Sequence, residues 1–436
     1  MSRTLFLQDI LSNVFERGRM FRSEKDSRDI VELCDAILSE QGEVSGSKLA
    51  ANILVRFQSM ELEDKRKFFV HLVENLDLDP ELIIEFAQAY AQEKSPDALK
   101  TLTKFADPQR RELLRRINQT PGATELLVGM REDLLKLLSQ EPQLKCLDVD
   151  FEHLFTAWFN RGFLVLKPID WKTPANILEK IIEYEAVHAI NDWDDLRRRL
   201  QPEDRRCFAF FHPAMPEEPL IFVEVALTKQ VPQSVNKLLA EERDTIDPNN
   251  FDTAVFYSIS NCQKGLLGVS FGNFLIKQVL HDLKLEFPNL KNFVTLSPIP
   301  GFRKWLEGES ANSGKEVLAS IQKVLDISEV GTASERLAPY EKPMKVLLAK
   351  YFMTDKRRDG KPIDPVARFH LGNGASLLQF NWMADISTNG LNQSACMMVN
   401  YKYDISTVEE NHENYEHEGA VNTTREIRSL AKQELK

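Results

Sequence analysis

The chain has 436 residues, of which 43% are hydrophobic and 28% are charged, and its formal net charge is −11. A chain of this length buries a sizeable core without disulfides or metal ions. The acidic balance argues against a non-specific nucleic-acid binder and against attachment to an anionic membrane surface, although a local basic pocket can still bind an anionic ligand.

The N-terminal segment and the cysteines together predict a compartment. The first twenty residues carry charges in every short window, so they lack the apolar core of a signal peptide. The five cysteines lie far apart and form no CxxC pair, which predicts neither a disulfide framework nor a metal site. No uncharged run reaches the roughly 18 residues that span a bilayer. We therefore expect a cytoplasmic protein without a membrane or nucleic-acid partner.

Residues 1–155 have the spacing of amphipathic helices. Ile30, Leu33 and Ile37, for example, recur at steps of three and four residues, which is the period of one helix face. There is no fixed longer period, so we expect a helical bundle rather than a solenoid. Such bundles usually serve assembly, and we predict an oligomerisation domain over 1–155. Helix starts are predicted at Ser45-Gly46-Ser47, Asp79-Pro80, Ser95-Pro96 and Asp107-Pro108.

Between residues 156 and 436 strand and helix patterns alternate, which is typical of an α/β or α+β domain with a mixed sheet. A hairpin is predicted where the turn-rich segment 212–216 separates two apolar strands. We expect a solvated loop after Tyr403, containing His412 and His417, and then a last helix. Strands are predicted at 163–166, 207–211, 220–227, 253–260, 292–296, 376–382 and 396–403, and helices at 173–185, 272–287, 317–325 and 343–351.

A glycine-spaced turn follows the predicted strand 253–260. Gly265, Gly268 and Gly272 allow the backbone to approach a ligand closely, and the backbone amides at the start of the next helix suit a diphosphate. The segment is neither a P-loop nor a GxGxxG fingerprint. The alternative is a strand-to-helix connection that needs glycines only for its own packing.

Ser297 directly follows the predicted strand 292–296 and precedes Pro298. A residue before proline is restricted to extended backbone, so this hydroxyl is held on a stiff support at the carboxyl end of a strand. Such a hydroxyl can donate or accept a hydrogen bond with little rearrangement. The alternative is a rigid turn in which Ser297 caps a helix around 303–306.

His370 lies among apolar residues just before Gly372-Asn373-Gly374. A histidine in this setting is a candidate for burial in its neutral form. A buried, neutral histidine can donate a proton near pH 7, which makes His370 a candidate acid. The alternative is a structural histidine whose ring hydrogen-bonds to the backbone of the turn.

Taken together, these segments resemble the malonyl-CoA decarboxylase family. The block Ser-Pro-Ile-Pro-Gly-Phe that begins at Ser297 and the block Asn-Trp-Met-Ala-Asp that begins at Asn381 are specific, whereas the helical third matches in type only. The matching segments, in family order, are 256–260, 265–277, 296–302, 364–367, 369–371, 373–375, 381–385 and 400–401.

The resemblance implies an N-terminal helical bundle followed by a GNAT-like mixed-sheet α/β domain over 156–436, which would be the catalytic domain. It also implies a homo-oligomer, such as a tetramer. It places the family's catalytic serine at Ser297, its catalytic histidine at His370 and a nearby family tyrosine at Tyr403. Some relatives have a glutamate at the Ser270 position. The residues that the resemblance places at the CoA diphosphate are Leu267, Gly268, Val269, Ser270, Phe271, Gly272 and Asn273.

The implied reaction is the decarboxylation of malonyl-CoA to acetyl-CoA and CO2. Loss of CO2 leaves a thioester enolate, so the reaction needs a donor at the thioester oxygen, a pocket shielded from water and a proton for the carbanion. We expect no cofactor and no metal, because the thioester itself accepts the electrons. Two alternatives stay open. A GNAT-type acyltransferase would share the turn but would not need His370 beside Ser297, and a non-catalytic acyl-CoA-binding protein would need neither.

Overall fold

The computed structural model describes residues 26–39, 43–243, 247–269, 274–313, 316–327 and 329–435. The chain divides into two compact units. Because unit 1 takes two later segments, these units do not decide the predicted boundary between residues 155 and 156, which stays a prediction. Unit 1 comprises Met1–Val165, Phe210–Leu220 and Cys262–Phe271, and unit 2 comprises Leu166–Ala209, Ile221–Asn261 and Gly272–Lys436.

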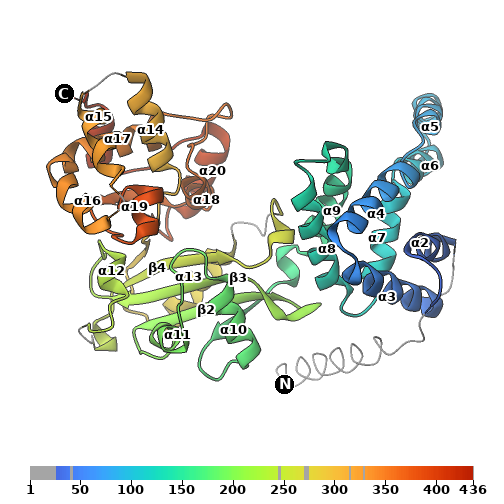
Figure 1. Ribbon diagram of the computed structural model, residues 1–436, viewed down its shortest axis with the longest axis horizontal. Helices are drawn as coiled ribbons and strands as arrows, with labels where there is room; N and C mark the ends of the chain where they lie inside the picture. The colour runs from blue at the N-terminus through green and yellow to red at the C-terminus, as the bar shows by residue number, and fades with distance from the viewer. Residues whose placement is uncertain are drawn as a thin grey trace. The chain divides into compact units, whose positions relative to one another are not determined.

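Helices make up most of unit 1 (Figure 1). Asp79 caps α5 by accepting backbone N–H groups, and Ser95 caps α6 in the same way, so both predicted starts are confirmed. The start predicted at Ser45-Gly46-Ser47 is wrong, because these residues lie inside α3. One glycine costs a helix only about 1 kcal/mol, which the packing of a helix face readily offsets. The helices are α2 Ile30–Ser39, α3 Glu43–Ser59, α4 Leu62–Asn75, α5 Pro80–Glu93, α6 Pro96–Phe105, α7 Gln109–Asn118, α8 Ala123–Leu137 and α9 Lys145–Trp158, with short 3-10 helices at Pro142–Leu144, Arg161–Phe163 and Lys264–Leu266.

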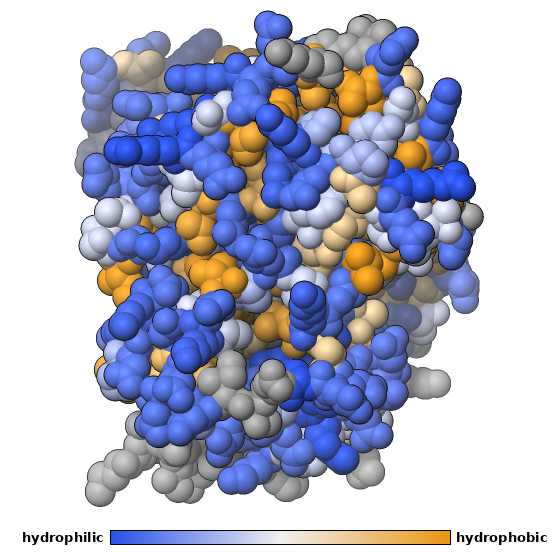
Figure 2. Space-filling model, turned by 90° about the vertical axis from the view of Figure 1, so that its left-hand side faces the viewer, coloured by the Kyte–Doolittle hydropathy of each residue, from blue (hydrophilic) through white to orange (hydrophobic). Residues whose placement is uncertain are grey.

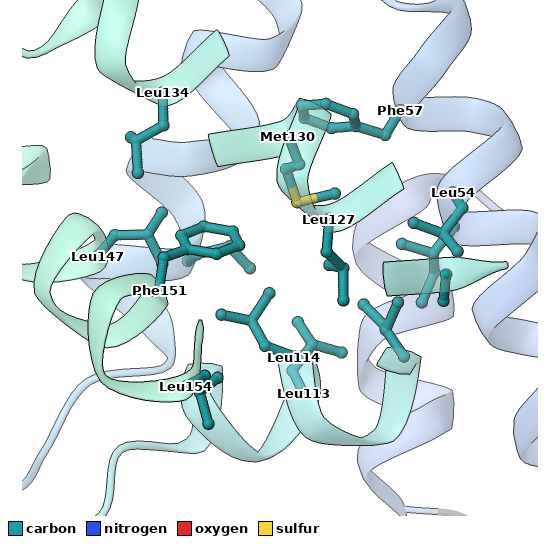
Figure 3. Packing of buried hydrophobic residues seen from close by; sticks show 14 of the residues in the cluster. Leu54, Phe57, Leu113, Leu114, Leu127, Met130, Leu134, Leu147, Phe151 and Leu154 are labelled. Carbon is teal, nitrogen blue, oxygen red and sulfur yellow. The ribbon is translucent and has the colours of Figure 1, made fainter. Parts of the chain in front are cut away.

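Leucine and phenylalanine side chains fill the core of unit 1. Leu113 of α7, Leu127 of α8 and Phe151 of α9 are fully buried and converge in Figure 3. The same cluster includes Leu266 and Val269, which belong to the glycine-spaced turn. The turn is therefore anchored by apolar burial on the helices of this unit.

In the described part of the chain, seven strands form one mixed sheet in the order β1-β2-β3-β4-β5-β7-β6. Strands β4 and β5 run parallel, whereas the pairs β3–β4, β5–β7 and β6–β7 are antiparallel. Helix α13 connects the parallel pair, as a parallel connection requires a crossover. The strands are β1 Val165–Ile169, β2 Arg205–His212, β3 Met215–Thr228, β4 Thr253–Asn261, β5 Asn292–Thr295, β6 Ser376–Asn381 and β7 Met398–Tyr403.

The parallel strands β4 and β5 part at one level of the sheet. Their pairing ends at Phe256 and Thr295, whereas β4 continues to Asn261. A bulge in the β3–β4 pairing, between Glu224 and Val225, lies at the same level. The segment after β5, which contains Ser297, therefore begins where the two strands separate.

The helix after Tyr403 corrects the sequence prediction. The segment expected to be a solvated loop is α20, which buries Val408 and Tyr415 on one face. Its many glutamates occupy the other faces and mask this helical period in the sequence. His412 and His417 are therefore helical, and the ring of His417 contacts Glu413. The helices of unit 2 are α10 Ala175–Tyr184, α11 Trp193–Leu200, α12 Val235–Leu238, α13 Phe274–Glu286, α14 Phe302–Ser313, α15 Glu316–Leu325, α16 Val330–Leu337, α17 Glu341–Met353, α18 Pro365–Gly372, α19 Thr388–Ser394, α20 Val408–Glu418 and α21 Arg425–Ala431, with short 3-10 helices at Pro248–Asn250 and Ala338–Tyr340.

The predicted succession of a helical bundle and a mixed-sheet α/β domain is confirmed by this element order and sheet. The GNAT-like character of the second domain stays a prediction. Among the described residues, no helix combines the length and apolar character needed to cross a membrane. The face in Figure 2 is mostly hydrophilic, with hydrophobic side chains gathered in small separate areas.

Candidate active site

Ser297 is held in place by backbone pairing with strand β7. It exchanges two backbone hydrogen bonds with Val399 of β7, at 2.8 and 2.9 Å. Beyond Pro298, the N–H of Ile299 donates to the buried hydroxyl of Ser394 at 2.9 Å. The stiff support expected from the proline is therefore present, and the Ser297 side chain projects from a fixed position with only 5% of the residue exposed.

His370 lies in the last turn of helix α18. Asp364 caps this helix by accepting the N–H of Ala367 at 2.8 Å, and Pro365 occupies the first helical position. This helix was not predicted from the sequence, although Asp364-Pro365 repeats the helix-start signal of Asp79-Pro80. The cap and the proline together fix where the helix begins, and so where His370 points.

Aromatic rings surround the His370 imidazole. Tyr401 stacks on it, with ring centroids 4.5 Å apart and planes inclined by 29°, and Phe369 and Tyr403 approach it edge-on. His370 is 3% exposed. This burial lowers the pKa of His370 to about 3, because charging the ring would cost its solvation. The imidazole is therefore neutral near pH 7.

The three sequence-predicted residues Ser297, His370 and Tyr403 form one hydrogen-bonded cluster. Ser297 Oγ lies 3.1 Å from His370 Nε2, and His370 Nδ1 lies 2.8 Å from the Tyr403 hydroxyl. Neither alternative interpretation holds. Helix α14 begins at Phe302 without a cap from Ser297, and both ring nitrogens of His370 contact side chains rather than the turn backbone.

Thr295 belongs to the same cluster and was missed. Its hydroxyl accepts a hydrogen bond from Ser297 Oγ at 2.9 Å and lies on the same face of the strand, two residues earlier. Thr295 is fully buried. The position of Thr295 was the signal that could have identified it. A residue two positions before a candidate donor at a strand end lies on the same face of the strand as that donor.

The glycine-spaced turn divides into residues with different roles. A side chain at Gly265 would collide with the backbone carbonyl of Val128, and Arg131 donates to the Gly265 carbonyl at 3.0 Å. Gly265 is therefore glycine for packing against α8, not for approaching a ligand. Gly268 has a φ of +84°, which a residue with a side chain rarely adopts. Next to it Leu267 is 70% exposed and Val269 is buried, and the predicted binding residues Ser270, Phe271, Gly272 and Asn273 lie outside the described residues.

The cluster in unit 2 can move or hold a proton in a dry setting. A neutral imidazole carries one N–H and one lone pair, and here each ring nitrogen meets a hydroxyl group. Shielding by Tyr401 and the strands strengthens any charge interaction at this point. Acid–base chemistry on a bound substrate is the activity that this arrangement supports.

Two family models match the chain. Residues 162–436 match the malonyl-CoA decarboxylase C-terminal domain, and residues 77–159 match the N-terminal domain of the same family. The chain belongs to the malonyl-CoA decarboxylase family. The family resemblance found in the sequence is thereby confirmed. Ser297, His370 and Tyr403 all lie within the segment that matches the C-terminal domain model.

Solved and curated malonyl-CoA decarboxylases are similar along most of the chain. The crystal structure of malonyl-CoA decarboxylase from Rhodopseudomonas palustris is 48% identical, with a TM-score of 0.84, and the match covers 92% of this chain and 98% of that one. The enzyme from Agrobacterium vitis is 46% identical, with a TM-score of 0.88 and coverage of 93% and 100%. The mitochondrial malonyl-CoA decarboxylase of Anser anser anser is 33% identical over 433 residues, covering 91% of this chain and 86% of that protein.

Proposed function

We propose that this chain decarboxylates malonyl-CoA to acetyl-CoA and CO2. The observation that carries the proposal is the 3.1 Å contact between Ser297 Oγ and His370 Nε2, which joins residues 73 positions apart in a member of the malonyl-CoA decarboxylase family. A hydroxyl–imidazole pair shielded from water can supply the hydrogen-bond donor and the proton donor that protonation of a thioester enolate requires.

The reaction makes three demands on the protein. The bond between the carboxylate and the methylene carbon breaks, and its electron pair passes into the thioester as an enolate. Negative charge then grows on the thioester oxygen, where a hydrogen-bond donor lowers the barrier. Finally the methylene carbon takes up a proton, which gives acetyl-CoA. A site that excludes water favours departure as neutral CO2.

We assign these tasks to the cluster. His370 acts as the acid whose N–H supplies the proton, which leaves an imidazolate that must take up a proton again before the next turnover. Because burial keeps the ring neutral near pH 7, the donor is the ring N–H and not an imidazolium. Ser297 is the hydrogen-bonding partner of the malonyl group or of the enolate oxygen. Tyr403 orients the imidazole through its contact with Nδ1.

We further propose that the turn from Leu267 to Asn273 binds the CoA diphosphate. The left-handed backbone at Gly268 and the exposed side chain of Leu267 support this assignment within the described part of the turn. Ser270 is small enough to line such a site. A Leu267→Asp variant should weaken CoA binding in a calorimetric titration, since a carboxylate would then face the phosphates. Unchanged affinity would remove the turn from the binding site.

No cofactor is required in this proposal, because the thioester is the electron sink. Protein dialysed against a strong chelator should therefore keep its full turnover. A loss of activity that added divalent metal restores would contradict this part of the proposal.

The deciding experiment is incubation of the pure chain with malonyl-CoA and no acceptor. We expect CO2 and acetyl-CoA in equal amounts. A GNAT-type acyltransferase would leave malonyl-CoA intact until an amine is added, and an acyl-CoA-binding protein would bind it without consuming it. Either of those results would overturn the proposed function.

We also propose that the enzyme is a cytoplasmic homo-oligomer whose contacts lie in residues 1–155. The five widely spaced cysteines, without a CxxC pair, suit a reducing compartment. Sedimentation velocity should give a mass of at least twice 50.1 kDa, and subcellular fractionation should place the chain in the cytosol. A monomer, or recovery in an organelle such as the one named for the Anser anser anser relative, would contradict these proposals.

A further inference from the structure

Thr295 sits at the centre of the hydrogen-bond cluster without contacting the imidazole itself. It is the last residue of β5 and is fully buried. Its hydroxyl oxygen accepts the backbone N–H of Tyr401 at 3.1 Å and the hydroxyl of Ser297 at 2.9 Å. A backbone N–H can only donate, so one lone pair of Thr295 is permanently occupied and the other is directed at Ser297.

These contacts fix the direction of the remaining hydrogen bonds. A serine hydroxyl has a single proton, and Ser297 gives it to Thr295, so at the 3.1 Å contact with His370 Nε2 it can only accept. Nε2 must then carry the hydrogen of the neutral ring. Nδ1 is left with a lone pair, and the Tyr403 hydroxyl at 2.8 Å is the donor to it.

We propose that Thr295 is a positioning residue that holds His370 in the tautomer with its hydrogen on Nε2, by accepting the proton of the Ser297 hydroxyl. The polarity is opposite to that of a hydrolase pair, in which the serine donates to the histidine and becomes a nucleophile. Thr295 thus leaves an N–H, not a lone pair, at the Nε2 that faces Ser297 Oγ. The Ser297 hydroxyl donates to an enolate oxygen only when its proton turns away from Thr295. The consequence for turnover rests on the proposed decarboxylation, whereas the tautomer does not.

The tautomer can be measured directly in the full chain. In ¹⁵N-histidine-labelled protein, the two ring nitrogens of a neutral histidine give distinct protonated and unprotonated signals, and a His370→Asn variant identifies which signals belong to His370. We expect a protonated Nε2 and an unprotonated Nδ1. The reverse pattern in the wild-type protein overturns the proposal without any Thr295 variant having to fold.

Variants of Thr295 test its part in the arrangement. Thr295→Val has the same shape but no acceptor, so the Ser297 proton is free to turn to His370, and the Nδ1–H form should appear. Turnover should fall about 10-fold with KM for malonyl-CoA within about two-fold, the scale of one lost hydrogen bond. Thr295→Ser should restore both the spectrum and turnover. An unchanged tautomer in Thr295→Val, or no rescue by serine, contradicts the proposal.

A matched control removes a comparable hydroxyl elsewhere in the sheet. Thr253 is also fully buried, and its hydroxyl contacts Asp252 and Asn292 rather than the cluster. Thr253→Val should leave the His370 signals and KM unchanged, and a similar loss of turnover there would make the Thr295 effect merely structural. Absence of malonyl-CoA turnover in the wild-type chain would defeat the proposed function, while the ¹⁵N pattern would still decide the tautomer.

Discussion

Asp364 and His370 stand at opposite ends of one short helix, α18, so that the carboxylate which starts the helix determines where the imidazole is held. Asp364 Oδ1 accepts the N–H of Ala367 at 2.8 Å, and its Oδ2 accepts the hydroxyl of Tyr351 at 3.4 Å. The helix has eight residues, too few to persist without a cap and tertiary packing. The position of the candidate acid therefore depends on a residue that does not touch it.

Replacement of Asp364 by alanine should lower both stability and turnover. Loss of an N-cap costs about 1 kcal/mol of unfolding free energy, and the freed helix start should let His370 move away from Ser297. Asp364→Asn keeps an oxygen acceptor and should retain most of both. Asp79 caps α5 with the same Asp-Pro signal in unit 1, so Asp79→Ala is the matched control. It should cost similar stability, measured by urea unfolding, but leave kcat unchanged. Equal kcat losses in both alanine variants would contradict the positioning role.

Removal of either Ser297 or His370, the two partners of the hydroxyl–imidazole contact, should lower kcat by more than the loss of a structural side chain does. His370→Asn should lower kcat by roughly 10²- to 10⁴-fold, the usual worth of positioned acid catalysis. Ser297→Ala should lower kcat more than it weakens CoA binding, because its contact is expected to strengthen as charge develops. His281→Asn, an exposed site on α13, is the control for histidine loss. Turnover of the His370 variant within a few-fold of wild type would remove this residue from the mechanism.

The pH dependence of stability should carry the signature of His370. Burial lowers its pKa to about 3, whereas the ordinary value is 6.5. Below pH 6.5 the unfolded chain takes up a proton that the folded protein refuses, so stability is lost as the pH falls, with a slope of at most about 1.4 kcal/mol per pH unit for one proton. The His370→Asn variant has no titrating group at this position, so its unfolding free energy does not carry this decrease at low pH. The difference in unfolding free energy between wild type and variant should therefore shift in favour of the variant between pH 7 and pH 5, as measured by urea unfolding. Parallel curves over this range would place the imidazole in contact with solvent.

The sequence identified the residues of the hydrogen-bonded cluster better than it predicted the local structure that brings them together. Their catalytic roles stay a prediction. The proline after Ser297 and the apolar residues around His370 are local signals, so both residues could be selected before any contact was known. Their meeting depends on the order β5-β7-β6, which no local pattern encodes. Thr295 was missed for the same reason, since its role is set by the backbone of Tyr401 on another strand.

Errors at element boundaries have equally specific causes. Strand β7 was expected from residue 396 but begins at Met398, because Ala395 and Cys396 both have positive φ. Apolar composition alone does not reveal such backbone. The sequence predicts a loop at helix α20 because the charged faces of this helix outweigh its narrow buried face, which includes Val408 and Tyr415. In both cases the folded structure differs from what the local pattern of apolar and charged residues predicts.

The glycine-spaced turn yields a last prediction that separates packing from ligand binding. A methyl group at Gly265 would lie within the radius of the Val128 carbonyl oxygen, which belongs to helix backbone and cannot move aside cheaply. Gly265→Ala should therefore destabilise the protein by about 1–3 kcal/mol, the usual cost of overpacking. Gly129 lies on the same helix α8 with open space around its Cβ position, so Gly129→Ala should instead stabilise the chain by up to about 1 kcal/mol. Urea unfolding of the two variants measures both signs. If Gly265→Ala proves as stable as wild type, the turn does not rest on α8 as described, and its glycine must be explained by a ligand after all.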